Sequence, residues 1–151
     1  MAIARVLHLL GIIIWLGGMF ALHFAVRPAA AQLPPETRLK LLAELLRRFF
    51  VIVAASIIAI YASGGALVVY AGGMANVGTY VHTMIALATV MTVIFLYIVR
   101  GPYRVLSTAV AVGDFVLAAR AMARIRLLVA TNLALGFVLT GLVVVGRAGA
   151  A

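Results

Sequence analysis

Long apolar stretches alternate with short basic segments along this chain. Four windows, residues 6–26, 49–70, 80–99 and 127–145, are apolar and long enough to cross about 30 Å of hydrocarbon. We therefore predict four transmembrane helices in an all-α, up-and-down four-helix bundle, because short connections favour antiparallel neighbours. No internal repeat or low-complexity linker divides the sequence, so we predict a single transmembrane domain over residues 1–151.

Three pairs of adjacent residues mark where these helices begin and end. The Pro34–Pro35 pair precedes leucines at helical spacing, so the second helix should begin well before the membrane. The Gly101–Pro102 pair should kink or end the third span, because proline lacks a backbone donor. The Gly113–Asp114 pair is typical of a helix stop and an N-cap, which places the next helix start near Phe115. Both basic connections are therefore predicted to be largely helical and to extend the bundle into the cytoplasm.

The composition indicates a protein embedded in lipid. Hydrophobic residues make up 67% of the 151 residues and charged residues only 10%, whereas soluble domains are about half apolar and about a quarter charged. The sequence has no cysteine, which excludes disulfides, thiolate metal sites and thiol redox chemistry. Its three acidic residues all fall in the basic connections, so hydrolysis or a carboxylate proton relay is not expected.

The formal net charge of +9 would suggest a nucleic-acid partner in a soluble protein. The placement of the charges gives a simpler explanation, because ten of the twelve basic residues follow the first and third spans. Only Arg5 and Arg147 lie on the other side. The positive-inside rule then puts both basic connections in the cytoplasm. We expect a multi-pass protein of a bacterial inner membrane, with periplasmic termini, a lipid bilayer around it and no nucleic-acid partner.

Three histidines interrupt the apolar spans. Ionisable side chains inside a bilayer are costly and are usually kept for a ligand, a pathway or a proton relay. The first and third spans run in the same direction, so His8 and His82, each within about two turns of the outer end, share a depth. His23 follows His8 by 15 residues, or about 22 Å of helix, which is too far to share that site.

Two imidazoles at one depth on separate helices are the arrangement that a b-type haem needs, with one on each face of the iron. His8 and His82 are therefore candidate axial ligands. Arg5 precedes His8 by about one turn and is a candidate partner for a haem propionate.

Copper is the alternative metal. The imidazoles of His8 and His82 could bind Cu(I) with the thioether of Met74, because soft sulfur and imidazole both suit this ion. Met19 and His23, four residues apart on one helical face, would then form a second, inner copper site.

Plainer roles compete with these assignments. A histidine near a helix end can reach the membrane interface or a backbone carbonyl, which applies above all to His23. Trp15 and most tyrosines fall near the predicted interfaces, where aromatic anchoring explains them. Met84 and Met91, seven residues apart on one face, fit packing better than a ladder of ligands. Asn132, in the fourth span, fits an interhelical hydrogen bond.

The segment HLLGIIIWLGG, from His8 to Gly18, with Arg27 and Pro28 after it, resembles the first helix of small CopD-like membrane proteins, a group associated with copper handling. Shorter segments are similar to the same family: Arg47 to Phe50, Ser63 and Gly64, Val81 to Met84, Pro102 to Arg104, Ile125 and Arg126, and Asn132 and Leu133. The resemblance spans nearly the full chain and implies a membrane protein that handles copper.

The same first-helix pattern, a histidine followed seven residues later by tryptophan, is similar to HemJ-type protoporphyrinogen oxidases, four-helix membrane proteins associated with haem b. This resemblance implies that His8 is a haem ligand or catalytic residue and places Trp15 in the cofactor site. In that family a lysine lies two residues after the third-helix histidine, and here Met84 occupies that position. The departure argues against the oxidase activity but not against the haem.

Three functions remain open from the sequence. The first is a metal centre near the periplasmic face, held by His8 and His82, with b-type haem for electron transfer ahead of copper; any enzyme activity would be that of a haem-linked oxidoreductase. The second is copper uptake or resistance, with Cu(I) passing through the bundle. The third is a ligand-free accessory membrane subunit whose basic helices bind anionic lipid or a partner protein. A redox or copper-handling partner is expected under the first two, and a chain of this size also suits a homodimer.

Overall fold

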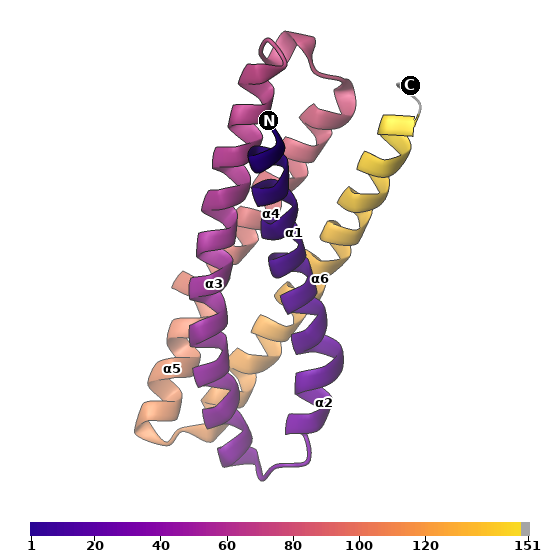
Figure 1. The fold of residues 1–151 in the computed structure, drawn as a ribbon. Helices are drawn as coiled ribbons and strands as arrows, with labels where there is room; N and C mark the ends of the chain where they lie inside the picture. Colours follow the sequence, from indigo (N-terminus) through magenta and orange to yellow (C-terminus); the bar gives the residue numbers. More distant parts are fainter. Residues whose placement is uncertain (149–151) are drawn as a thin grey trace.

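The structure is a computed structural model that describes residues 1–148, and Figure 1 shows these residues as a bundle of helices. In chain order the elements are α1 (Ala2–Ala21), the single π-helical turn η1 (Leu22–Val26), α2 (Arg27–Ala30), α3 (Pro35–Tyr70), the 3-10 turn η2 (Met74–Asn76), α4 (Thr79–Arg100), α5 (Pro102–Val112) and α6 (Phe115–Ala148). The predicted all-α four-helix bundle is confirmed. Residues 149–151 of the predicted single domain lie outside the described residues.

Four helical rods are long and apolar enough to cross a membrane: Ala2–Ala30, Pro35–Tyr70, Thr79–Val112 and Phe115–Gly146. Their outward surfaces are apolar, as the exposed fractions of Ile3 (77%) and Ile58 (70%) illustrate. A surface of this kind is stable only against lipid, where helices satisfy their own backbone hydrogen bonds. The chain therefore has the construction of a multi-pass membrane protein.

The helix boundaries predicted at Pro34–Pro35, Gly101–Pro102 and Gly113–Asp114 are confirmed, because local chemistry determines them. The second long helix, α3, begins at Pro35 with Pro34 as its N-cap residue, and Gly101 separates α4 from α5. Gly113 ends α5 in a left-handed conformation (φ 77°) that favours glycine, and Asp114 Oδ1 accepts a 2.9 Å hydrogen bond from the Leu117 amide. At 1.5 Å per residue the 36 residues of α3 extend over about 54 Å, so the helix projects well beyond a hydrocarbon core of about 30 Å.

The first helix continues further than the sequence pattern predicts. It passes residue 26 and reaches Ala30 by way of η1, where the Arg27 amide donates to the Leu22 carbonyl. Pro28 explains the wider turn, because its ring would clash with the carbonyl of Phe24 in a regular α-helix. The widened turn therefore lets a proline occupy a continuous helix.

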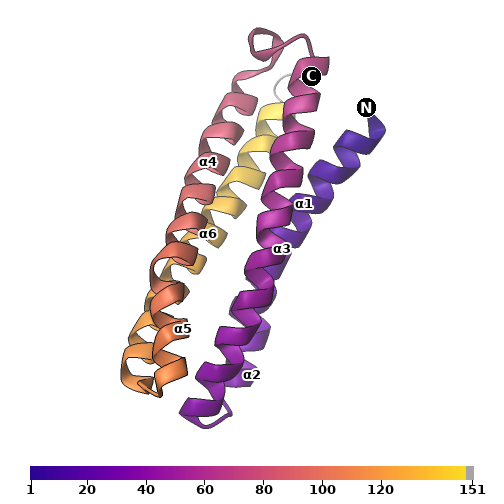
Figure 2. The same ribbon diagram turned by 90° about the vertical axis from the view of Figure 1, so that its left-hand side faces the viewer.

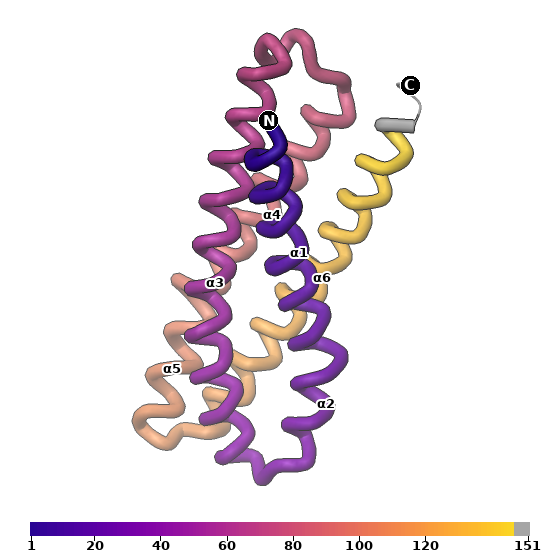
Figure 3. The backbone as a smooth tube through the Cα atoms, viewed as in Figure 1, coloured from indigo at the N-terminus to yellow at the C-terminus, as the bar shows by residue number. Residues whose placement is uncertain are grey.

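The helices pack as two pairs. Figure 2 shows α1 beside α3 on one side of the molecule, and α4 with α5 beside α6 on the other. We call the end that carries residues 31–34 and the Gly113–Asp114 turn the basic end. Met1, residues 71–78 and the last turns of α6 lie at the opposite end, as the backbone tube in Figure 3 shows.

The two pairs are joined most closely in the half of the bundle nearest the basic end. There the ring of Phe50 lies edge-on to Phe95 and Tyr103, with centroid distances of 5.8 and 5.1 Å. The Tyr103 hydroxyl also donates to the Ala43 carbonyl at 3.4 Å. In the other half α6 leans away from the N-terminal part of α1 (Figure 1). A cavity lies in this diverging half, away from the basic end.

Candidate functional site

A cavity of about 590 Å³ lies between the four long helices in this diverging half. Its walls are almost entirely apolar, and His8 is the only ionisable side chain with a nitrogen among the lining residues of the described chain. Binding sites for organic ligands typically occupy about 300–1,000 Å³ and combine apolar walls with a few placed polar groups. The cavity is therefore a candidate site for a hydrophobic ligand held at one point by imidazole.

The position of His8 is determined by α3. Its Nδ1 lies 3.0 Å from the carbonyl oxygen of Ile60 and 3.2 Å from Ser63 Oγ. The Ser63 hydroxyl in turn donates to carbonyls of its own helix, at Ala59 and Ile60. Gly64 also packs against the His8 ring, since a Cβ atom there would approach His8 Cε1 to 3.1 Å. The half-buried ring is therefore packed on the backbone of α3 and is not free to rotate into lipid.

These contacts assign the neutral tautomer of His8. A backbone carbonyl can only accept a hydrogen bond, so in the neutral imidazole the proton resides on Nδ1 and the lone pair on Nε2. Histidine ligands of metals usually have this arrangement, with one nitrogen on the metal and the other donating to a carbonyl or carboxylate. His8 therefore has the hydrogen-bonding pattern of a metal ligand.

Methionine thioethers line the same cavity. Met74 comes from η2, and Met84 and Met91 come from α4. Met91 is 2% exposed and belongs to the core, as its spacing predicts, whereas Met84 is half-buried and Met74 exposed. The cavity thus combines one imidazole with two accessible thioethers, which is a soft set of donors.

Trp15 forms part of the cavity wall nearest the middle of the bundle. The indole is 3% exposed and packs in the hydrophobic core. Interface anchoring therefore does not explain Trp15. Trp15 instead closes one side of the cavity.

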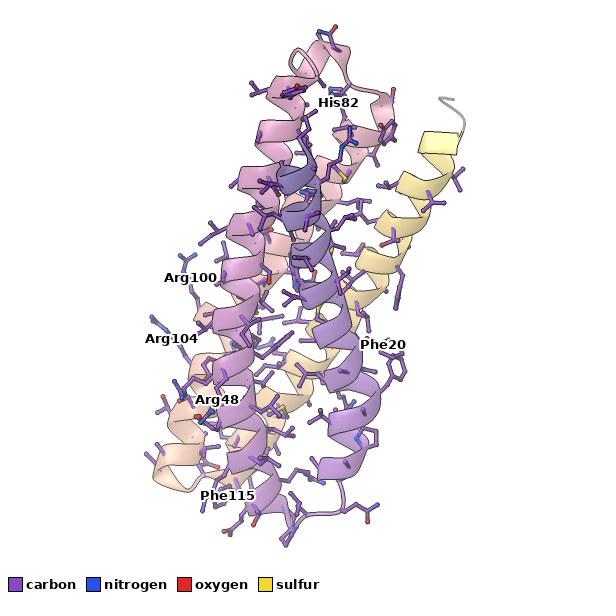
Figure 4. All side chains as sticks on the ribbon, in the orientation of Figure 1. Phe20, Arg48, His82, Arg100, Arg104 and Phe115 are labelled. Atoms are coloured by element: carbon purple, nitrogen blue, oxygen red, sulfur yellow. The ribbon has the colours of Figure 1, made fainter. Side chains whose placement is uncertain are left out.

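His82 does not share the cavity with His8. It is exposed, it is absent from the lining residues, and its Nδ1 lies 3.4 Å from the Gly78 carbonyl of its own helix end. Figure 4 shows His82 near the end of the bundle opposite the basic end. The α4 side chains that line the cavity are instead those of Met84, Ile85, Ala88 and Met91.

Arg5 is exposed and lies on α1 three residues before His8, which places it on nearly the same face of the helix. It is not among the residues that line the cavity. Its position is therefore beside the cavity and closer to the end of the bundle, where a long guanidinium side chain can reach a polar group in the interface.

The structure separates the other predicted copper pair. Met19 is 2% exposed in the core, whereas His23 is half-buried and lines a different cavity near the basic end. Residues four apart share one face only in a regular α-helix. The π-helical turn begins at Leu22 and changes the direction in which the side chains after it point. Met19 and His23 therefore do not face a common site.

Three residues of the site were not singled out as ligands or supports by sequence reasoning. Ser63 and Gly64 hold the His8 ring, and the Tyr61 hydroxyl lies 3.2 Å from Thr89 Oγ1, which connects α3 to α4 beside the cavity. The signal was present in the glycine pair at residues 64 and 65, because small residues mark close approaches between helices. Residues 1–148 contain no group of three or more His, Cys, Asp or Glu side chains able to hold a metal ion.

Comparison of the chain with protein-family models, with curated proteins and with solved structures gave no match.

Proposed function

We propose that this protein binds a b-type haem in the cavity beside His8 and serves in electron transfer within a bacterial inner membrane, with its basic end in the cytoplasm. The observation that carries the proposal is the imidazole of His8, whose Nδ1 donates to Ile60 while the ring lines an apolar cavity of about 590 Å³. The first-helix resemblance to haem-associated membrane proteins supports it. A haem supplies one-electron redox chemistry when bound.

The lining residues fit such a cofactor. A haem is flat and largely hydrophobic, and the cavity presents apolar side chains from all four rods. Nε2 of His8 is the proposed first axial donor, because the carbonyl of Ile60 keeps the ring proton on Nδ1. Arg5, one turn nearer the end of the bundle, is the proposed partner of a propionate.

The proposed second donor is a thioether. Met84 lies on the α4 wall of the cavity and Met74 lies near its end, whereas His82 is outside it. A His/Met pair raises the reduction potential of haem relative to two imidazoles. Bis-histidine ligation by His8 and His82 would require α4 to rotate at its first turn.

Copper is the second candidate, and one observation favours it. His8, Met74 and Met84 line the same cavity, and imidazole with two thioethers is a donor set that suits Cu(I). Passage of copper through the bundle receives less support, because Met19 and His23 do not face a common site. A static Cu(I) site is therefore the form of the copper proposal that the geometry favours.

The test uses Trp15, the single tryptophan, as a reporter beside the cavity. Purified full-length protein is titrated with haem while absorption and tryptophan fluorescence are recorded, and bound iron and copper are quantified before titration. We expect a saturable Soret band and quenching of Trp15 by energy transfer to the haem. His8→Ala should weaken binding at least about tenfold, a loss of about 1.4 kcal/mol.

His82→Ala and Met84→Leu are the matched variants. Loss of the low-spin spectrum in Met84→Leu but not in His82→Ala supports His/Met ligation, and the reverse supports bis-histidine ligation. Copper with no haem band moves the assignment to the Cu(I) site. Unchanged haem and copper binding in His8→Ala would overturn both metal proposals and favour a ligand-free accessory subunit.

A further inference from the structure

A second cavity, of about 360 Å³, lies near the basic end between α2, α3 and α6. Its polar side chains are those of His23, Arg27, Arg38 and Arg126. The other lining residues are small or apolar, and no acidic residue of the described chain is among them. Three guanidinium groups from three separate helices therefore face one space.

The positive charges of this cavity have no partner among residues 1–146. The salt bridges in this part of the chain join Glu44 to Arg47 and Arg48, each at 2.8 Å. Asp114 instead accepts the Leu117 amide as a helix cap. Arg27 is repelled by the charges of both Arg126 and Arg38, with no opposing carboxylate.

The grouping of these positive charges costs electrostatic free energy, which a bound anion would offset. Arg27 and Arg38 are half-buried and Arg126 is exposed, and Arg27 loses part of its hydration while it faces the other two positive charges. A guanidinium presents a planar fork of donors that matches the oxygens of a phosphate group. His23, also half-buried at the cavity, supplies a further donor.

The fold brings these groups together through the widened turn in the first rod. The π-helical turn Leu22–Val26 contains His23 and leads directly into Arg27, and both side chains line the cavity together with Pro28. The same turn separates His23 from Met19. A π-helical turn is frequently found at a functional site, because it redirects side chains without ending the helix.

The apolar windows of the first and fourth spans put the cavity at the level of the lipid headgroups. Arg27 comes directly after the apolar window 6–26, and Arg126 comes directly before the window 127–145. Both arginines are therefore located where the hydrocarbon gives way to the interface. Basic pockets between transmembrane helices at this level typically accept anionic headgroups.

From this geometry we infer that the cavity formed by His23, Arg27, Arg38 and Arg126 binds the phosphate group of an anionic phospholipid. The inference concerns the basic end and does not depend on the haem proposal. It assigns to these side chains a defined headgroup site, which is distinct from general attraction between a basic surface and a membrane.

The test measures the binding of phosphatidylglycerol to the full-length protein by native mass spectrometry in detergent. The cavity variant is Arg38→Gln with Arg126→Gln, and the control is Arg104→Gln with Arg120→Gln, two exposed arginines outside the cavity. Both pairs remove the same net charge. We expect at least about tenfold weaker binding in the cavity variant and less than about twofold in the control.

Equal loss in the two variants, or no loss in either, would overturn the headgroup site. If millimolar inorganic phosphate displaces the lipid, the cavity is still a phosphate site, but the proposal that its ligand is a phospholipid is overturned. If inorganic phosphate does not displace the lipid, the phospholipid proposal is supported. If the cavity variant does not fold, the double variant Arg38→Lys with Arg126→Lys is measured instead. It keeps the positive charges and removes the planar guanidinium groups that could bind phosphate through two hydrogen bonds. Wild-type affinity in that variant would overturn bidentate recognition, and reduced affinity would support it.

Discussion

The imidazole of His8 lies against the backbone of Gly64, so closely that a Cβ atom at that glycine would be 3.1 Å from Cε1 and 3.4 Å from Nδ1 of the histidine. This contact, together with the Ile60 carbonyl, aims the ring at the cavity. Gly64 therefore positions His8 as well as lining the cavity itself.

Gly64→Ala should displace the His8 ring by a few tenths of an ångström and weaken haem binding by about threefold to tenfold, which corresponds to about 0.6–1.4 kcal/mol. The measurement is the haem titration followed by Trp15 fluorescence. Gly17→Ala is the matched control, because Gly17 does not line the cavity and a Cβ atom there meets nothing within 4 Å. Equal affinities in the two variants would show that Gly64 does not position the histidine.

Gly11→Ala should loosen the packing of α1 on α3. A Cβ atom at Gly11 would lie 2.7 Å from Ile60 Cγ1 and 3.2 Å from the Ser56 carbonyl oxygen, so the helices must separate. We expect a loss of about 1–3 kcal/mol in the free energy of unfolding, measured by denaturant titration in mixed micelles. Gly17→Ala, with nothing within 4 Å of its Cβ, should leave stability nearly unchanged, and a similar loss in both would contradict this packing.

Asp114→Ala should destabilise the start of α6, because the Leu117 amide loses its 2.9 Å acceptor. The expected cost is about 1 kcal/mol, seen as a lower Tm in a thermal unfolding experiment. Asp114→Asn keeps an acceptor oxygen at the same place and should retain most of the stability. A Tm for Asp114→Ala equal to that of the wild type would show that the cap contributes nothing.

Asn132 should tolerate an apolar replacement better than a charged one. Its Nδ2 donates to the Met91 carbonyl at 3.1 Å, but its buried Oδ1 has no partner among the described residues. Asn132→Leu removes both the bond and the unpaired oxygen, so we expect a change in stability of less than about 1 kcal/mol. Asn132→Asp should cost more than about 2 kcal/mol, and detergent unfolding curves in which the aspartate variant is the more stable of the two would refute this assignment.

The helix ends could be predicted from the sequence because each depends on a few adjacent residues. Pro35 begins α3, Gly113 ends α5 and Asp114 caps α6, and none of these needs information from a distant part of the chain. The extension of the helices beyond the membrane follows from the same signals. Local stereochemistry was therefore sufficient for the fold class.

The pairing of His8 with His82 could not be settled in this way. Residue counting gives the depth of a side chain along a helix, but its direction about the axis depends on which neighbours the helix contacts. Met84, two residues beyond His82, is rotated from it by about 200° and lines the cavity, whereas His82 does not. The π-helical turn before Pro28 had a sequence signal, a proline within an apolar span, but its effect on His23 depends on the structure around it.

The uneven packing of the bundle has a mechanical consequence. The half that contains Phe50, Phe95 and Tyr103 is filled with interlocked rings, and close-packed interiors resist compression. The diverging half contains a cavity of about 590 Å³, so the side chains that line it face empty space on one side and resist compression less. A force on the bundle would therefore change the separation of α1 and α6 in the diverging half. The helices would stay in place around the aromatic cluster, so only one face of the membrane would register the displacement.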